Sequence, residues 1–237
     1  MSGDALAVRR SELERGLSGV HERIERACDA AGRDPADVTL IAVTKFFPAS
    51  DVDLLVDLGV RDIGENRHQE ARDKVARLHT RGELTVHFIG QLQTNKAAGV
   101  AEYADVVHSV DRLRLVEALD RGAHRAGRQL GALVEVALDE EQGRGGVAPA
   151  EAPLVADGIA AAAHLDLRGV MAVAPLGGDP APAFARLAEV ARGIRASHPG
   201  ARWLSAGMSG DLEAAVAHGA THLRVGSAIL GSRPSHR

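Results

Sequence analysis

A lysine stands at the end of an apolar run, where lysines are uncommon. The segment TLIAVTK, residues 39–45, is largely apolar up to Lys45, and Phe46, Phe47 and Pro48 follow directly. Lysine is rarely buried unless a partner pairs with it or the protein uses it. Either the stem packs while the amine reaches water, or the amine is desolvated, has a lowered pKa and can form a Schiff base. The apolar residues around Lys45 favour the second interpretation.

Small and hydroxyl-bearing residues near the end of the chain predict a phosphate site. Ser209 comes just before a helical pattern that carries Asp211 and Glu213, so it is a natural N-cap, and capping alone would explain it. Gly226 and Ser227 lie in the turn after the last predicted strand. Glycine lets a backbone approach a ligand closely, and free N–H groups at a helix start bind anions. A lysine beside such a site implies a phosphorylated carbonyl compound as ligand.

Arg224 lies shortly before this turn, between Leu223 and Val225. Because side chains alternate along a strand, Arg224 should occupy the face opposite these two apolar residues. It is either a solvated charge or a group that points into the interior and meets the ligand.

Other polar patterns are less informative. The segment DEEQGRGGV, residues 139–147, resembles a phosphate-binding glycine loop, but such turns are common and we interpret it as a mobile loop. His218 and His222 are four residues apart, yet a predicted helix-to-strand junction separates them, and the eleven histidines show no metal-ligand spacing. Cys28 is assigned to packing on an outer helix. We find no Ser-His-Asp arrangement.

The scaffold that positions these residues is an alternation of short apolar runs and amphipathic helices. Residues 4–31 are predicted as an N-terminal helix. Strands are predicted at residues 38–45, 60–66, 85–90, 105–111, 129–139, 167–175, 202–209 and 221–231. Eight strand–helix units favour an α/β fold, a (β/α)8 TIM barrel over about residues 38–231, rather than an open doubly wound sheet. Residues 1–237 are read as a single domain.

Composition narrows the class of partner. The net charge is −4 and the pI is near 6.3, which argues against nucleic acid or an anionic membrane surface. With one cysteine the chain has no internal disulfide, so a cytoplasmic location is expected. The sequence shows neither a signal-peptide pattern nor an apolar window long enough for a membrane span.

Several blocks of sequence resemble one family. They are IAVTKFFPASDV, DIGENRHQEARDK, VHFIGQLQTNK, LRGVMAVAP and WLSAGMSGDLEAAVAHGATHLRVGSAILG. With them the chain resembles the YggS family of pyridoxal phosphate homeostasis proteins, which look like the barrel domain of alanine racemases. The resemblance extends from residue 6 to residue 234, and HFIGQLQTNK is its most specific block. Two places depart from it: Arg67, where many members have an aromatic residue, and the loop at 139–147.

The resemblance implies pyridoxal phosphate as cofactor and assigns residues to it. It implies that Lys45 holds the cofactor as an internal aldimine and that Arg224 lies against the pyridine nitrogen. The remaining contacts that it implies are Ser209, Gly226 and Ser227 at the phosphate, Ser205 nearby, Asn66 near the ring, and His87 on a neighbouring strand.

The arginine decides what chemistry we expect. Arginine keeps its proton, so the ring nitrogen should stay unprotonated and the cofactor should be a weak electron sink. Racemases that share this arginine add a tyrosine base from a partner subunit, whereas this chain has one tyrosine, Tyr103, and no second domain. We therefore predict a monomeric carrier that buffers pyridoxal phosphate and could pass it to apo-enzymes. The alternatives are a weak amino-acid racemase and, from the pattern alone, a Schiff-base aldolase acting on a sugar phosphate.

Overall fold

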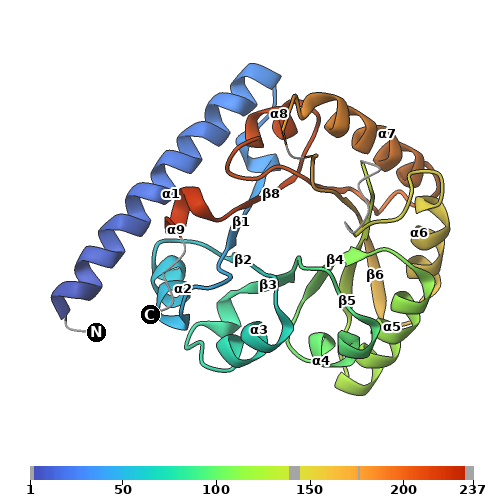
Figure 1. Ribbon diagram of the computed structural model, residues 1–237, viewed down its shortest axis with the longest axis horizontal. Coiled ribbons are helices and arrows are strands. Elements are labelled where there is room, and N and C mark those ends of the chain that lie inside the picture. The colour runs from blue at the N-terminus through green and yellow to red at the C-terminus, as the bar shows by residue number, and fades with distance from the viewer. Residues whose placement is uncertain (1–2, 139–144, 176, 233–237) are drawn as a thin grey trace.

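The computed structural model describes residues 3–138, 145–175 and 177–232. Eight parallel strands close into a barrel in chain order (Figure 1). They are β1 Thr39–Val43, β2 Asp62–Glu65, β3 Thr85–Phe88, β4 Val106–Val110, β5 Leu130–Glu135, β6 Leu165–Met171, β7 Trp203–Ser205 and β8 His222–Val225. The predicted (β/α)8 barrel is confirmed, and the open sheet is excluded because β8 pairs directly with β1.

Helices surround the barrel (Figure 1). In chain order they are α2 Ala49–Asp57, α3 His68–Val75, α4 Ala97–Ala101, α5 Leu113–Ala126, α6 Ala152–Ala161, α7 Ala181–Ser197, α8 Leu212–Ala217 and α9 Ser227–Leu230. Three short 3-10 helices, η1 Pro35–Asp37, η2 Arg81–Glu83 and η3 Thr94–Lys96, lie between these elements. The prediction of a strand over 221–231 is wrong beyond Val225, because the chain turns at Gly226 into α9.

The N-terminal helix α1, Gly3–Ala31, lies outside the ring and packs against α8 and α9 (Figure 1). Cys28 is fully buried on it, as predicted for a packing residue. At Gly16 a Cβ atom would come within 2.5 Å of the carbonyl oxygen of Ile229, so only glycine allows this approach. The helix α1 therefore supports α9 from outside.

The core is built almost entirely from aliphatic side chains, as expected for a chain with 3% aromatic residues. Leucine, valine, isoleucine and alanine fill the space between strands and helices, and Phe88 and Phe184 are the largest fully buried side chains. The barrel interior differs, because His87, His108 and Arg224 are buried in it with their hydrogen-bonding partners.

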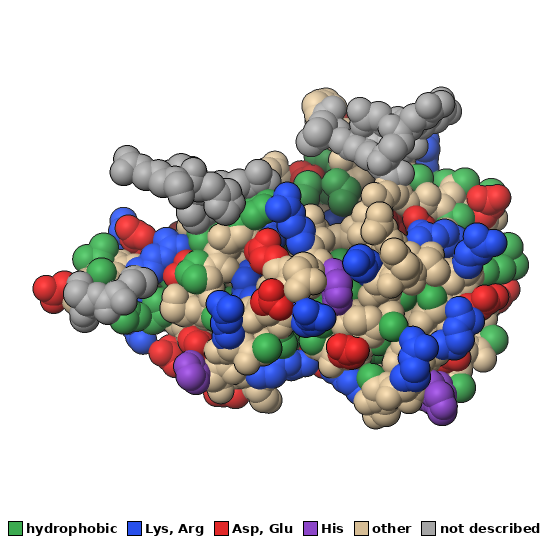
Figure 2. Space-filling view, turned by 60° about the horizontal axis from the view of Figure 1, so that its bottom comes forward, with side chains coloured by type: hydrophobic (Ala, Val, Ile, Leu, Met, Phe, Trp, Pro, Cys, Tyr) green, Lys and Arg blue, Asp and Glu red, His purple; other side chains and the backbone are tan. Residues whose placement is uncertain are grey.

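The surface carries both signs of charge. On the face in Figure 2, Lys and Arg side chains are interspersed with Asp and Glu side chains over most of the molecule. Within the described ranges, none of the helices combines the length and the apolar character that crossing a bilayer requires.

Candidate functional site

Lys45 lies at the mouth of the barrel, shortly after β1 ends. It is half-buried, and its Nζ atom lies 6.0 Å from the centroid of the Phe46 ring. A cavity of about 200 Å³ has Lys45 and Phe46 in one part of its lining and Gly226 and Ser227 in another. These segments are far apart in sequence and meet because β1 and β8 pair, with Ala42 opposite Val225. The structure thus brings the predicted amine beside the predicted phosphate turn.

Ser209 does not cap a helix, so this part of the prediction is wrong. Asp211 is the residue before α8, and Ser209 lies outside the helix. The Oγ atom of Ser209 instead accepts hydrogen bonds from the N–H of Ala228 (3.3 Å) and from the hydroxyl of Ser227 (3.2 Å). Two hydroxyl groups and the first turn of α9 therefore converge.

Gly226 and Asn66 reach the same end of the barrel, after β8 and β2 respectively. A Cβ at Gly226 would lie 3.2 Å from the carbonyl oxygen of Val43, so a side chain there would crowd β1. Asn66 is half-buried, and its backbone carbonyl oxygen lies close to Gly90. A Cβ atom on Gly90 would be 2.1 Å from that oxygen. Both residues are thus held at the mouth by close backbone packing.

Arg224 points into the barrel, which decides between the two alternatives that the sequence left open. Its guanidinium donates to the Oγ of Ser205 (2.7 Å) and to the carbonyl oxygen of Ala172 (2.8 Å), and the side chain is buried. Burial lowers the pKa of Arg224 to about 10, an effect that Glu135 opposes. The guanidinium therefore remains charged at neutral pH.

A chain of hydrogen bonds leads away from Arg224 through the buried interior and ends at the half-buried Asp62. Ser205 Oγ lies 3.0 Å from His108 Nδ1, His108 Nε2 lies 2.8 Å from His87 Nδ1, and His87 Nε2 lies 2.9 Å from Asp62 Oδ1. We call these five residues the polar relay. His87, predicted as a cofactor contact, is fully buried, and its ring nitrogens hydrogen-bond with Asp62 and His108.

The two ends of the polar relay determine its proton positions. Arg224 can only donate, and the carboxylate of Asp62 can only accept. If both imidazole rings are neutral, His87 donates from Nε2 to Asp62, His108 donates from Nε2 to His87, and Ser205 donates from its hydroxyl to His108. Burial, reinforced by His87, lowers the pKa of His108 well below its ordinary value, which agrees with a neutral ring.

Glu135 is a half-buried ionisable group near Arg224. It ends β5, where burial and, secondly, Asp111 raise its pKa to about 7, while Arg224 and Arg112 oppose the rise. Its Oε2 atom is buried without a hydrogen-bond partner among the described residues. Sequence reasoning missed this residue.

Other predicted features lie elsewhere. Tyr103 packs in the helix layer, where its ring stacks on that of His68 at 5.8 Å. His218 contacts the carbonyl oxygen of Ala214, whereas His222 lies against the ring of Trp203 at 3.9 Å. Of the loop at 139–147, residues 139–144 lie outside the described part of the chain.

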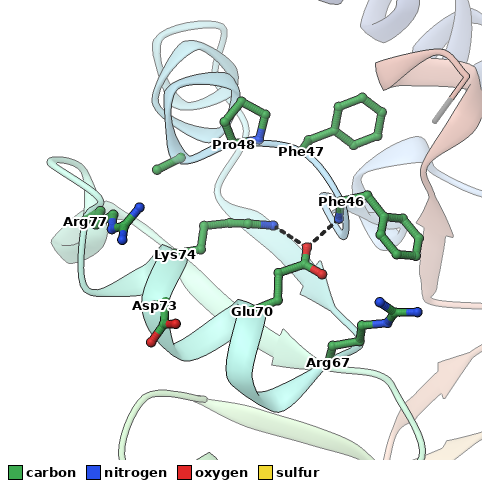
Figure 3. Close-up of a pocket in the computed structure, with 9 residues that line it drawn as sticks. Phe46, Phe47, Pro48, Arg67, Glu70, Asp73, Lys74 and Arg77 are labelled. Atoms are coloured by element: carbon green, nitrogen blue, oxygen red, sulfur yellow. Dashed lines mark hydrogen bonds and ion pairs between the residues drawn. The ribbon is translucent and has the colours of Figure 1, made fainter. Parts of the chain in front are cut away.

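A third polar group surrounds the peptide units next to Lys45. Lys74 Nζ is buried and donates to Glu65 Oε1 (2.7 Å) and to the carbonyl oxygen of Thr44 (2.7 Å). It also lies 3.4 Å from Glu70 Oε1, which accepts the N–H of Phe46 (Figure 3). None of these contacts could be anticipated from sequence, since α3 reads as an ordinary charged helix.

Comparison with known proteins agrees with the barrel fold and with the family that the sequence blocks resemble. The family described as alanine racemase, N-terminal domain, matches residues 18–234. A pyridoxal phosphate homeostasis protein of Mycobacterium tuberculosis is 43% identical over 244 residues, which cover 95% of this chain and 94% of that protein. An unknown protein from Bifidobacterium adolescentis superposes with a TM-score of 0.89 at 35% identity, covering 94% of this chain and 96% of that one. PipY of Synechococcus elongatus with pyridoxal phosphate bound superposes with a TM-score of 0.78 at 36% identity, covering 88% and 100%. The chain therefore belongs to the pyridoxal phosphate homeostasis protein family and carries an alanine racemase N-terminal domain.

Proposed function

We propose that this chain binds pyridoxal 5′-phosphate at the mouth of its barrel and serves in the homeostasis of that cofactor. The observation that carries the proposal is that Lys45 and the turn at Gly226 and Ser227 line one cavity. Two relatives support the choice of ligand. The Mycobacterium tuberculosis protein is named for pyridoxal phosphate homeostasis, and the PipY structure contains pyridoxal phosphate.

The residues at the mouth fit this group by their chemistry. An amine at Lys45 suits an aldehyde, which it would hold through a Schiff base. The hydroxyl groups of Ser209 and Ser227, with the backbone at Gly226, suit a phosphate. The guanidinium of Arg224, supported by Ser205, suits a ring nitrogen that accepts a hydrogen bond. We assign Asn66 to the ring and place His87 behind Arg224, through the polar relay.

The small number of lysines supports Lys45 as the residue that forms the Schiff base. The chain contains three lysines, Lys45, Lys74 and Lys96. Lys74 is buried and has three acceptors around its Nζ, whereas Lys96 is exposed at the end of η3. Lys45 is the lysine that lines the cavity with Ser227.

Arg224 argues for holding the cofactor rather than for strong catalysis. When bound, pyridoxal phosphate supplies an electron sink for carbanion chemistry, most effectively with a protonated ring nitrogen. Arg224 keeps its own proton and would donate a hydrogen bond to that nitrogen. Tyr103, the one tyrosine of the chain, lies in the helix layer beside His68. We therefore favour a carrier, acting in the cytoplasm as a monomeric single-domain protein, over a weak amino-acid racemase.

An absorbance titration with pyridoxal phosphate tests the binding site. The wild type should develop the visible band of a protonated Schiff base, and borohydride should fix the label on Lys45, as read by peptide mass spectrometry. Lys45→Ala should lose the band, while Lys96→Ala should keep it. A label found on Lys74 or Lys96 would refute the assignment, and a wild type without any band would refute the cofactor.

Two further measurements separate the carrier from an enzyme. Racemisation in deuterated water at about 1 s⁻¹ or faster would be an ordinary enzyme rate and would overturn the carrier proposal. A carrier should instead restore activity to an apo-enzyme when loaded protein is the only source of cofactor. The absorbance spectrum of the protein as isolated tests the aldolase alternative, because a Schiff-base aldolase acting on a sugar phosphate would carry no chromophore of its own.

A further inference from the structure

The residue after Lys45 has an unusual backbone conformation. Phe46 has φ of 72°, and it is the one described non-glycine residue with a positive φ. This left-handed region is unfavourable for a residue with a Cβ atom, and bulky side chains adopt it only when surrounding contacts enforce it. Something must therefore hold the chain at the point where Lys45 enters the cavity.

The contacts that enforce this conformation come from α3 (Figure 3). The N–H of Phe46 donates to Glu70 Oε1 at 2.5 Å. One helical turn later, Lys74 Nζ lies 3.4 Å from the same oxygen and donates to the carbonyl oxygen of Thr44 at 2.7 Å. The bonded carbonyl belongs to the peptide unit before Lys45, and the bonded N–H belongs to the peptide unit after it. Both peptide units that flank the lysine are thus held by one helix.

A buried carboxylate completes the arrangement. Glu65, at the end of β2, accepts from Lys74 Nζ at 2.7 Å and from the hydroxyl of Thr44 at 2.6 Å through the same oxygen. The exposed fraction of the side chain is 0% for Glu65 and 5% for Lys74. A buried ion pair is costly to desolvate and is weak evidence for stability by itself. Its retention at this position is explained if it maintains a geometry.

We propose that Lys74, Glu70 and Glu65 are positioning residues for Lys45, directing its amine toward the turn at Gly226 and Ser227. We call these three residues the lysine clamp. The inference rests on the proposed function, because it concerns the same site. It adds that α3 controls how readily Lys45 engages an aldehyde by holding the two residues on either side of that lysine, Thr44 and Phe46.

Two ligands distinguish positioning from a general structural role. Pyridoxal phosphate can bond covalently to Lys45, whereas pyridoxamine phosphate shares the ring and phosphate but has an amine in place of the aldehyde. Glu70→Ala should weaken pyridoxal phosphate binding and slow the appearance of the Schiff-base band, each by about tenfold, because the left-handed conformation is no longer held. The affinity for pyridoxamine phosphate should stay within about twofold, since the phosphate site is unchanged.

Matched variants complete the experiment. Asp73→Ala, on the same helix, removes a carboxylate that points away from the clamp in Figure 3 and should match the wild type with both ligands. Glu70→Gln keeps the acceptor oxygen and should retain most of the binding. In the Glu70→Ala background, Phe46→Gly should bind pyridoxal phosphate more tightly than Phe46→Ala by about fivefold, because both lack the ring but only glycine tolerates positive φ.

The outcomes are separable. Equal losses for both ligands in Glu70→Ala would show a merely structural role, and an unchanged Schiff-base rate would show that the clamp does not act on Lys45. Either result overturns the inference while leaving the cofactor site intact. A wild type that binds neither ligand would instead refute the proposed function.

Discussion

Replacing Glu135 by glutamine should make the protein more stable, and increasingly so at higher pH. Glu135 ends β5 as a half-buried carboxyl whose pKa is raised to about 7, chiefly by desolvation and secondly by Asp111. A raised pKa means that the folded chain favours the neutral acid. Its contribution to stability is fully present below the unfolded pKa and is lost as pH rises through the folded pKa. Glutamine keeps the shape without the charge.

The size of the effect follows from the pKa values. The pKa rises from an ordinary 4.5 to about 7. At ~1.4 kcal/mol for each pKa unit, ionising Glu135 at pH 8 costs the folded state about 3 kcal/mol, and at pH 5 less than about 1 kcal/mol. For a chain of this length, 3 kcal/mol corresponds to a rise of about 6–12 °C in Tm.

Urea unfolding at pH 5, 6, 7 and 8, without added cofactor, measures this directly. The free energy of unfolding of Glu135→Gln minus that of the wild type should grow with pH over this range. Glu117→Gln, an exposed carboxyl on α5, is the matched control and should show a flat difference. A difference for Glu135→Gln that does not change with pH, or a wild type that is the more stable protein at pH 8, would refute the reasoning.

Two further predictions concern the interior of the barrel. His108→Phe breaks the polar relay and leaves Ser205 and His87 without their buried hydrogen-bond partner. The free energy of unfolding, measured by urea titration, should therefore fall by about 2–4 kcal/mol. A loss of less than about 1 kcal/mol would mean that the polar relay does not contribute to stability. Gly169→Ala should lower it by about 3 kcal/mol or more, because φ is 151° and a Cβ would lie 1.9 Å from the carbonyl oxygen of Trp203. Gly200→Ala, where a Cβ meets open space, is the control and should be nearly neutral.

The sequence predicts the strand-end residues well because the alternation of apolar strands and helices assigns them to one mouth. Lys45 and Gly226 were placed at that mouth from local pattern alone, whereas for Arg224 the pattern left a solvated and an inward-facing position open. Ser209 was misassigned for a local reason too. A serine before a helical pattern suggests an N-cap for that helix. The hydroxyl of Ser209 instead accepts hydrogen bonds from Ser227 and Ala228 in α9, a contact between distant segments that a local pattern cannot predict.

The polar groups that support these residues were not predicted, and their separation in the chain explains why. His108 hydrogen-bonds with Ser205, 97 residues away in the chain. Lys74 donates a hydrogen bond to the carbonyl oxygen of Thr44, the residue before Lys45 and 30 residues away. The one available signal for His108 was a histidine within the apolar strand VVHSV, the same kind of exception that drew attention to Lys45. A sequence pattern can single out a polar residue within an apolar strand, but it does not predict which residue will hydrogen-bond to it.

By itself, the sequence determined the barrel, the lysine at the end of β1 and the glycine turn after β8, since hydrophobic periodicity and chain order are local properties. Only the tertiary structure decided the hydrogen-bonding state of Arg224, the raised pKa of Glu135 and the left-handed Phe46 held by α3. These properties depend on distances across the closed barrel and on the exclusion of water. Both arise only when β8 pairs with β1, so no single segment of the sequence encodes them.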